Sequence, residues 1–142
     1  MNFGYIGIIA SLAFAAVGSA FGAGKAAMAT IGGWKKCFAQ NKPAPFMLMA
    51  FVGMPLTQTI YGFILMRNLI DIKDSDPWML LAAGVLGGLA MGFSALFQGK
   101  AGAAGSDAFS ETGKGFAQYM LVVGLIETVA LFAMIFIMIT IT

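Results

Sequence analysis

Hydrophobic residues fall into four long stretches along the chain, separated by three short and more polar connections. Each stretch reaches the roughly 20 residues that an α-helix needs to cross about 30 Å of hydrocarbon. Apolar runs of this length with so few charges predict membrane-spanning helices. The pattern therefore predicts an all-α membrane protein with four transmembrane helices, over Phe3–Gly33, Ala44–Met66, Pro77–Gly105 and Gly115–Thr142.

The composition supports a membrane protein and excludes several other classes. Of the 142 residues, 60% are hydrophobic and only 10% are charged, whereas a soluble domain carries roughly 25% charged residues. The sequence contains no nucleophile–base pair and no nucleotide-binding loop, so we expect a protein that is not catalytic by itself. The net charge of +2 is dispersed along the chain and does not indicate nucleic acid as a partner.

The cysteine and histidine content argues against an internal disulfide and against a metal-ligand cluster. Cys37 is the single cysteine, so it cannot form an internal disulfide, and the chain has no histidine. A metal-ligand cluster of these residues is therefore not expected. The first stretch has no preceding Lys or Arg and is longer than the apolar core of a typical signal peptide, so we expect a retained helix.

The basic residues predict an orientation, because Lys and Arg accumulate on cytoplasmic loops. The second connection has only two, Arg67 and Lys73. We therefore expect a multi-pass protein of the cell membrane, with the first and third loops in the cytoplasm and both termini on the opposite side. The six basic residues at or near those two loops are Lys25, Lys35, Lys36, Lys42, Lys100 and Lys114.

Two segments recur later in the chain, which indicates an internal duplication. Ser19–Ala26 resembles Ser94–Ala101 at an offset of 75 residues, and Leu56–Ile60 resembles Leu125–Val129 at an offset of 69. The first helix therefore corresponds to the third, and the second to the fourth. Both copies begin on the same side of the membrane, so the repeat is parallel.

The duplication defines the expected organisation of the chain. We expect a single proteolipid domain over 1–142, made of a first helical hairpin, 1–70, and a second helical hairpin, 76–142. The first and third helices are rich in small residues, which let helix backbones approach closely. A narrow inner layer of this kind suits a closed ring of copies. Tight packing inside a monomeric bundle would explain the spacing of the small residues equally well.

Glu127 is the only carboxylate in the uncharged run Phe116–Thr142, and it lies near the middle of that run. An ionised carboxylate at the bilayer centre is costly, so it usually faces a partner, a cavity or an ion. A neutral acid held by one interhelical hydrogen bond is the less specific alternative. In the duplication Gln58 corresponds to Glu127, and Ala23 corresponds to Gln98. The chain therefore has a single ionisable site for four helices.

The intramembrane polar residues fall at one expected depth. Gln98 and Glu127 are equidistant from a turn at residue 112 or 113. At a rise of about 1.5 Å per residue, an antiparallel hairpin places both side chains about 20 Å from that turn. Ala23 and Gln58 are likewise equidistant from residue 40 or 41. We therefore expect Gln58, Gln98 and Glu127 on one level of the bundle.

The segment after Pro55 adds further oxygen atoms. A proline in a helix removes one backbone N–H and loosens nearby carbonyls for other partners. Thr57 and Gln58 offer side-chain oxygens, and Tyr61 lies one turn beyond Thr57. Together with the intramembrane amide and carboxylate described above, these residues form an oxygen set of the kind that hard cations prefer. Taken singly, the Thr and Tyr hydroxyls are equally compatible with routine interhelical hydrogen bonds.

These motifs closely resemble the rotor-ring proteolipids (subunit K) of bacterial V-type, or V/A-type, sodium-transporting ATPases. The resemblance covers the whole chain: a duplicated hairpin, Pro-x-Thr-Gln in the second helix, Phe-Gln-Gly-Lys in the third and Ile-Glu-Thr in the fourth. In sodium-pumping members, side-chain oxygens and one backbone carbonyl hold the ion, and a tyrosine hydrogen-bonds the glutamate. The resemblance assigns these roles to Glu127, Gln98, Gln58, Thr57, the Met54 backbone carbonyl and Tyr61.

The resemblance also implies a transported ion, a mechanism and partners. Because the full oxygen set is present, it favours Na⁺, with H⁺ as the alternative. It implies a homo-oligomeric ring in the lipid bilayer, a stator membrane subunit with half-channels, and a central-stalk subunit at the first and third loops. ATP hydrolysis in a soluble head would drive rotation, and Glu127 would be neutralised wherever its site faces lipid. One carboxylate for four helices favours an ATP-driven pump over a synthase.

Two other classes remain open. A small multidrug exporter also combines four short helices with an intramembrane glutamate, but such exporters carry it in the first helix and line their cavity with Trp and Tyr. Here Trp34 and Trp78 lie at expected membrane interfaces. A structural four-helix protein without transport would not need the convergent oxygen set.

Overall fold

The computed structural model describes residues 3–141, which form helices joined by short turns. The helices η1, α2, η2 and α3 follow one another without a break and make a single rod, Phe46–Asp71. The prediction of an all-α chain with four helices able to span a membrane is confirmed. Met1, Asn2 and Thr142, at the ends of the predicted hairpins, lie outside the described residues. The elements are α1 (Gly4–Ala39), η1 (Phe46–Leu48), α2 (Met49–Gly53), η2 (Met54–Leu56), α3 (Thr57–Asp71), α4 (Pro77–Thr112) and α5 (Phe116–Ile141).

Two helices are longer than their hydrophobic stretches predicted. Helices α1 and α4 have 36 residues each and extend past Gly33 and Gly105, where the apolar stretches end. A helix of this length reaches about 54 Å, well beyond the hydrocarbon thickness of about 30 Å. Hydrophobicity marks the part of a helix that lies in lipid, whereas the helix itself continues while its backbone stays hydrogen-bonded. Helix α4 ends at Thr112, and the next residue, Gly113, adopts a left-handed conformation with a φ of 64°.

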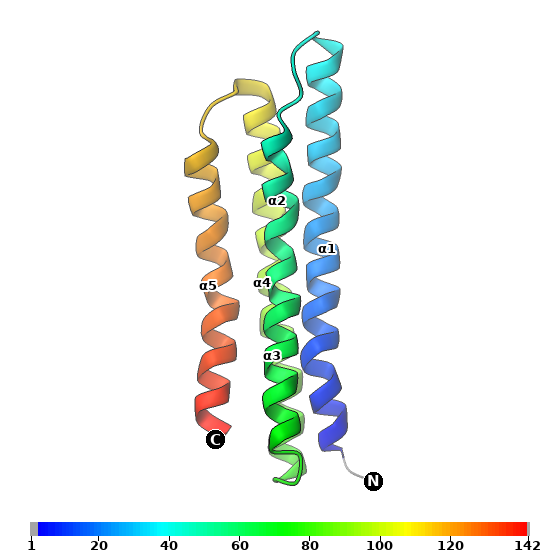
Figure 1. Cartoon of the computed structure of the whole chain (residues 1–142), viewed down its shortest axis with the longest axis vertical. Coiled ribbons are helices and arrows are strands. Elements are labelled where there is room, and N and C mark those ends of the chain that lie inside the picture. Colours follow the sequence, from blue (N-terminus) through cyan, green and yellow to red (C-terminus); the bar gives the residue numbers. More distant parts are fainter. Residues whose placement is uncertain (1–2, 142) are drawn as a thin grey trace.

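The helices run antiparallel in sequence order, so the connections alternate between the two ends of the bundle. Figure 1 shows the connections at residues 40–45 and 113–115 at one end, and the start of α1, the end of α5 and the 72–76 turn at the other. Helix α4 packs against both α1 and α5, and α3 packs against α1 and α4. The first and third loops therefore share one end of the molecule.

Helices α1 and α4 are in backbone contact, as their small residues predicted. A methyl group added to Gly84 would meet the backbone of Gly7, and one added to Gly99 would meet the backbone of Gly22. Such glycine pairs replace side-chain packing by direct backbone contact. Both pairs are 77 residues apart, so each of these α1 residues lies within two residues of the α4 position that corresponds to it at the offset of 75.

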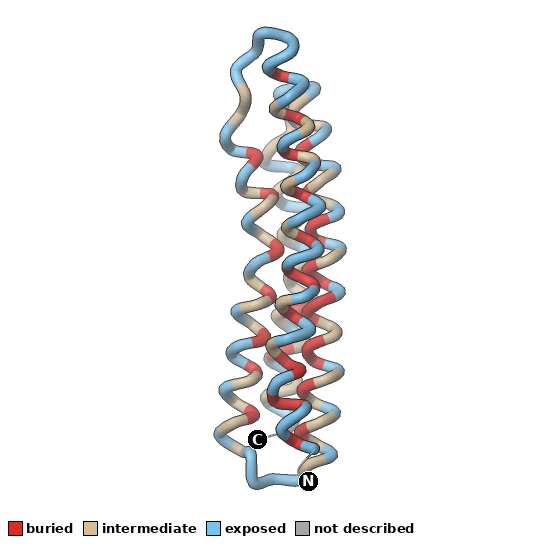
Figure 2. Tube along the Cα trace, turned by 90° about the vertical axis from the view of Figure 1, so that its right-hand side faces the viewer, coloured by how far each residue is buried: buried red, intermediate tan, exposed pale blue. Residues whose placement is uncertain are grey.

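The outer surface of the bundle is strongly apolar. Figure 2 shows buried positions where the helices face one another and exposed positions on their outward sides. Among the exposed positions are large side chains such as Met28, Leu121 and Ile139, each more than 65% exposed. Within the described residues α5 has only three buried positions, Val123, Ala130 and Met134. A surface of this composition suits lipid and neighbouring copies rather than water.

Candidate ion-binding site

Glu127 lies in the middle of α5 and faces α3 and α4. Its Oε1 accepts a hydrogen bond of 2.7 Å from the Tyr61 hydroxyl, and its Oε2 accepts one of 3.2 Å from Gln98 Nε2. Both donors approach from other helices, and the carboxylate is half-buried between them. Hydrogen bonds to an ionised group are stronger than those between neutral groups, so these two contacts hold the carboxylate toward the bundle.

The two glutamines form the buried centre of the site. Gln58 on α3 and Gln98 on α4 are both fully buried. Gln58 Nε2 donates to Gln98 Oε1 at 2.7 Å, and Gln98 Nε2 also donates to the Val123 carbonyl at 3.2 Å. A buried amide without partners is costly. The pair therefore fixes α3, α4 and α5 at one depth.

The η2 turn supplies the remaining oxygens. Pro55 has no N–H to donate, and Met54–Leu56 adopts the tighter 3-10 geometry at this point. The Met54 carbonyl accepts from the Thr57 N–H, and also from the Thr57 hydroxyl at 2.9 Å. The same hydroxyl lies 3.2 Å from Gln58 Oε1. A carbonyl, a hydroxyl and an amide oxygen are thus adjacent on one short segment.

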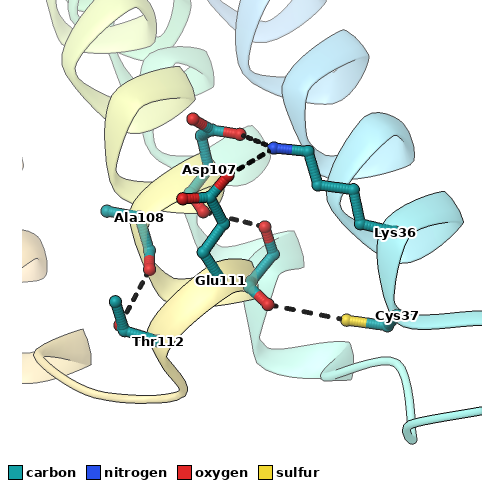
Figure 3. A network of polar contacts seen from close by, with 7 residues as sticks. Lys36, Cys37, Asp107, Ala108, Glu111 and Thr112 are labelled. Atoms are coloured by element: carbon teal, nitrogen blue, oxygen red, sulfur yellow. Dashed lines mark hydrogen bonds and ion pairs between the residues drawn. The ribbon is translucent and has the colours of Figure 1, made fainter. Parts of the chain in front are cut away.

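No ion pair within residues 3–141 involves Glu127; the pairs that form lie toward the ends of the helices. Figure 3 shows the largest cluster, in which the Lys36 ammonium bridges Asp107 and Glu111 at 2.8 Å each. These exposed pairs join α1 to α4 near the loops, where water screens them. Among the described residues, the Glu127 carboxyl group has hydrogen-bond donors but forms no ion pair with a cationic side chain.

The structure brings together all six residues that the sequence analysis singled out. Hydrogen bonds join them into one network, which confirms that the intramembrane polar residues share a level. Whether this network binds an ion stays a prediction. Its members are Met54, Thr57, Gln58, Tyr61, Gln98 and Glu127.

Two contacts escaped the sequence analysis. The Val123 carbonyl accepts from Gln98, and the Ser94 hydroxyl donates at 2.9 Å to the Ile126 carbonyl, directly before Glu127. A backbone carbonyl of valine leaves no trace in a sequence. Ser94 could have been found, because it lies one turn before Gln98 on the same face of α4.

The second hairpin matches the C-subunit family of ATP synthases over residues 81–140. The match includes the α4 and α5 parts of the site, so the second hairpin is similar to this family.

A curated relative extends the similarity to the first hairpin. The chain is 32% identical, over 134 residues, to the A-type ATP synthase subunit K of Methanocaldococcus jannaschii. The alignment covers 93% of this chain and 58% of the relative, so the chain spans somewhat more than half the length of the protein that it matches.

Proposed function

We propose that this chain is the ion-carrying subunit of the rotor ring of a rotary ATPase, and that the ion it carries is Na⁺. The observation that supports the proposal most strongly is the network around Glu127. One carboxylate, two amide groups, a hydroxyl and a backbone carbonyl are linked by hydrogen bonds within the apolar part of the bundle.

The chemistry of the network favours a monovalent hard cation. Oxygen atoms are the ligands that hard cations prefer, and one carboxylate balances one positive charge. Na⁺ would replace the present hydrogen bond between the Thr57 hydroxyl and the Met54 carbonyl, so that both oxygens face the ion. Gln98 Oε1 accepts only one hydrogen bond here and keeps a lone pair for the ion. H⁺ would need the carboxylate alone and would leave the neutral oxygens without a role.

Neutralisation of Glu127 links ion binding to rotation. An ionised carboxylate facing lipid is costly, whereas an occupied site is not. In the proposed mechanism each copy loads Na⁺ at one half-channel of a stator subunit, passes the lipid in the neutral form, and releases the ion at a second half-channel. The chain itself is not catalytic, and ATP hydrolysis in other subunits supplies the energy.

The two ends of the bundle have different proposed partners. The connections at 40–45 and 113–115 share one end. Lys35, Lys36, Lys42 and Lys114 lie in or directly beside them, whereas Arg67 and Lys73 lie at the other end, so we place the two connections in the cytoplasm. A central-stalk subunit would contact this end, while the apolar outer surface faces lipid and neighbouring copies of the chain. One carboxylate for four helices carries fewer ions per turn, which suits an ATP-driven pump.

Labelling of Glu127 by a hydrophobic carbodiimide tests the proposal, because the reagent reacts with a protonated carboxyl group. In the purified protein we expect labelling that millimolar Na⁺ suppresses. Glu127→Gln should abolish the labelling, whereas Glu111→Gln, which alters an exposed carboxylate at the loop end, should leave it unchanged. Labelling that follows pH and ignores Na⁺ would assign H⁺ as the transported ion. No labelling at any pH would contradict ion transport altogether.

A further inference from the structure

Ser19 on α1 is a buried polar residue that the network above does not use. Its side chain is 1% exposed, and its hydroxyl has no hydrogen-bond partner among residues 3–141. Within a helix a serine commonly bonds a carbonyl of the preceding turn, as Ser11 does with Ile8 at 2.6 Å. A buried hydroxyl without a partner is unfavourable, so a second arrangement of the protein that supplies a partner would be stabilised.

Contacts between α1 and the η2–α3 rod place Ser19 at the depth of the ion site. A methyl group on Gly62 would meet Ala15, and one on Gly22 would meet Pro55. Because the two helices run antiparallel, moving four residues along α1 from Ala15 corresponds to moving four residues back from Gly62. The residue opposite Ser19 is therefore Gln58, at the centre of the proposed site.

The second hairpin shows what a serine at this place does. Ser94 corresponds to Ser19 in the duplication and donates to the Ile126 carbonyl at 2.9 Å. In the same alignment Thr57 corresponds to Ile126. The matching hydrogen bond in the first hairpin would run from the Ser19 hydroxyl to the Thr57 carbonyl, and it is not formed in this structure.

The η2 turn gives a physical reason for the difference. Helix α5 is a regular α-helix through the positions that precede Ile126. In the first hairpin the corresponding positions form the 3-10 turn Met54–Leu56, which directly precedes Thr57. A 3-10 turn has a different rise and rotation per residue from an α-helix. The carbonyls that follow it are therefore displaced relative to α1.

We infer that Ser19 is a positioning residue of the ion site, whose hydroxyl donates to the Thr57 carbonyl when the site holds Na⁺. In the proposed occupied site the Met54 carbonyl and the Thr57 hydroxyl turn from each other to face the ion, and we assign an accompanying shift to the η2 turn that joins them. The Ser19 hydrogen bond would stabilise the rearranged turn. The inference rests on the proposed Na⁺ function, because it assigns a role to Ser19 only in the occupied site.

The test compares Ser19→Ala with Ser11→Ala in the purified full-length protein, using carbodiimide labelling of Glu127. Ser19→Ala should raise the Na⁺ concentration that gives half-protection by about fivefold, the value expected for one hydrogen bond. The pH midpoint of labelling without Na⁺ should not change, because the inference assigns this bond to the occupied site alone. Ser11→Ala removes a buried hydroxyl from the same helix, two turns away, and should leave both quantities unchanged.

Thermal unfolding supplies a second readout, in which Ser19→Ala and Ser11→Ala should affect the unfolding temperature differently. Without Na⁺, Ser19→Ala should unfold at the same or a higher temperature than the wild type, because it removes an unpartnered buried hydroxyl. Ser11→Ala should unfold at a lower temperature, because it removes a formed hydrogen bond. If Ser19→Ala does not assemble, Ser19→Cys, which keeps a weak donor of similar size, should show an intermediate loss of Na⁺ protection.

The outcomes separate this inference from the function on which it rests. Wild-type half-protection in Ser19→Ala, or an equal shift of the Na⁺ and pH midpoints, would overturn the role of Ser19 and leave the Na⁺ site standing. A wild-type protein that Na⁺ does not protect would overturn both.

Discussion

The two hairpins share one scaffold but contribute differently to the site. Each begins with a helix rich in small residues, and the paired helices α1 and α4 lie in backbone contact. The first hairpin supplies neutral oxygens and the Tyr61 hydroxyl, whereas the second supplies the only carboxylate of the network and the amide of Gln98. Neither hairpin contains the whole network. The two similar hairpins thus form one network between them rather than two equivalent networks.

The comparison also shows what changed after the duplication. Glu127 corresponds to Gln58, Gln98 to Ala23, and the carbonyl-bearing Val123 to Met54. Val123 and Met54 each offer a backbone carbonyl to the network. Val123 does so from a regular helix, and Met54 does so from a 3-10 turn. The carbonyl position is therefore shared, and the side chains around it have diverged.

Replacing the carboxylate of the second hairpin by the glutamine that the first hairpin carries should have the largest effect on Na⁺ binding. Glu127→Gln gives both copies a glutamine and removes the charge that balances the cation. Losing one partner of a charge pair inside a protein costs about 3–5 kcal/mol, so Na⁺ binding and Na⁺-dependent ATP hydrolysis should fall at least about 100-fold. Transport in reconstituted vesicles measures the effect. Transport at the wild-type rate would contradict the role assigned to Glu127.

Giving α4 the alanine that α1 carries at the corresponding position should have the next largest effect on Na⁺ binding. Gln98→Ala copies Ala23, removes a proposed ligand and leaves the amide of Gln58 without its acceptor. The loss of buried hydrogen bonds at a charged site predicts about 3 kcal/mol, or roughly 100-fold weaker Na⁺ protection of Glu127. Gln118→Ala on the exposed side of α5 is the matched control. Equal behaviour of the two variants would show that Gln98 does not bind the ion.

A substitution that forces α1 and α4 apart should change the free energy of unfolding rather than the chemistry of the proposed ion site. A methyl group at Gly99 would meet the backbone of Gly22, whereas a methyl group at Gly24 has nothing within 4 Å in the chain. Overpacking predicts that Gly99→Ala lowers the free energy of unfolding by about 1–3 kcal/mol. Gly24→Ala should be neutral or slightly stabilising, because alanine favours a helix. Thermal unfolding in detergent compares the two, and equal midpoints would exclude tight α1–α4 contact.

Removing the tyrosine hydroxyl should have the smallest effect. Tyr61 corresponds to Ala130 in the second hairpin, and its hydroxyl donates to Glu127 without being a proposed ligand. Tyr61→Phe should weaken Na⁺ protection by about tenfold, the low end of the loss expected for one hydrogen bond to a charged group. Tyr5→Phe, at an exposed position of α1, serves as the control. An unchanged Na⁺ dependence in Tyr61→Phe would show that the hydroxyl does not hold the carboxylate in place.

Much of this arrangement could be predicted from the sequence, because a membrane limits the alternatives. Four apolar stretches fix four helices, and the duplication fixes their correspondence and the shared depth of Gln58, Gln98 and Glu127. The membrane makes each intramembrane polar residue conspicuous. Gln58, Gln98 and Glu127 were therefore identifiable without coordinates as one group, whereas the Met54 carbonyl was assigned only from the family resemblance.

Other features depend on backbone geometry and could not be predicted. Hydrophobicity does not mark where α1 and α4 end in water, so their extensions past Gly33 and Gly105 were missed. A proline indicates a local disturbance, but the 3-10 turn Met54–Leu56 and the unpartnered hydroxyl of Ser19 follow only from coordinates. The Val123 carbonyl is likewise invisible in a sequence, because every residue has one.

Equilibrium binding of radioactive sodium to the purified protein tests the central claim most directly. The account predicts one Na⁺ for each chain, displaced as the pH falls because protons compete for Glu127, and none in Glu127→Gln. A folded wild-type protein that binds no Na⁺ at any pH would contradict the account.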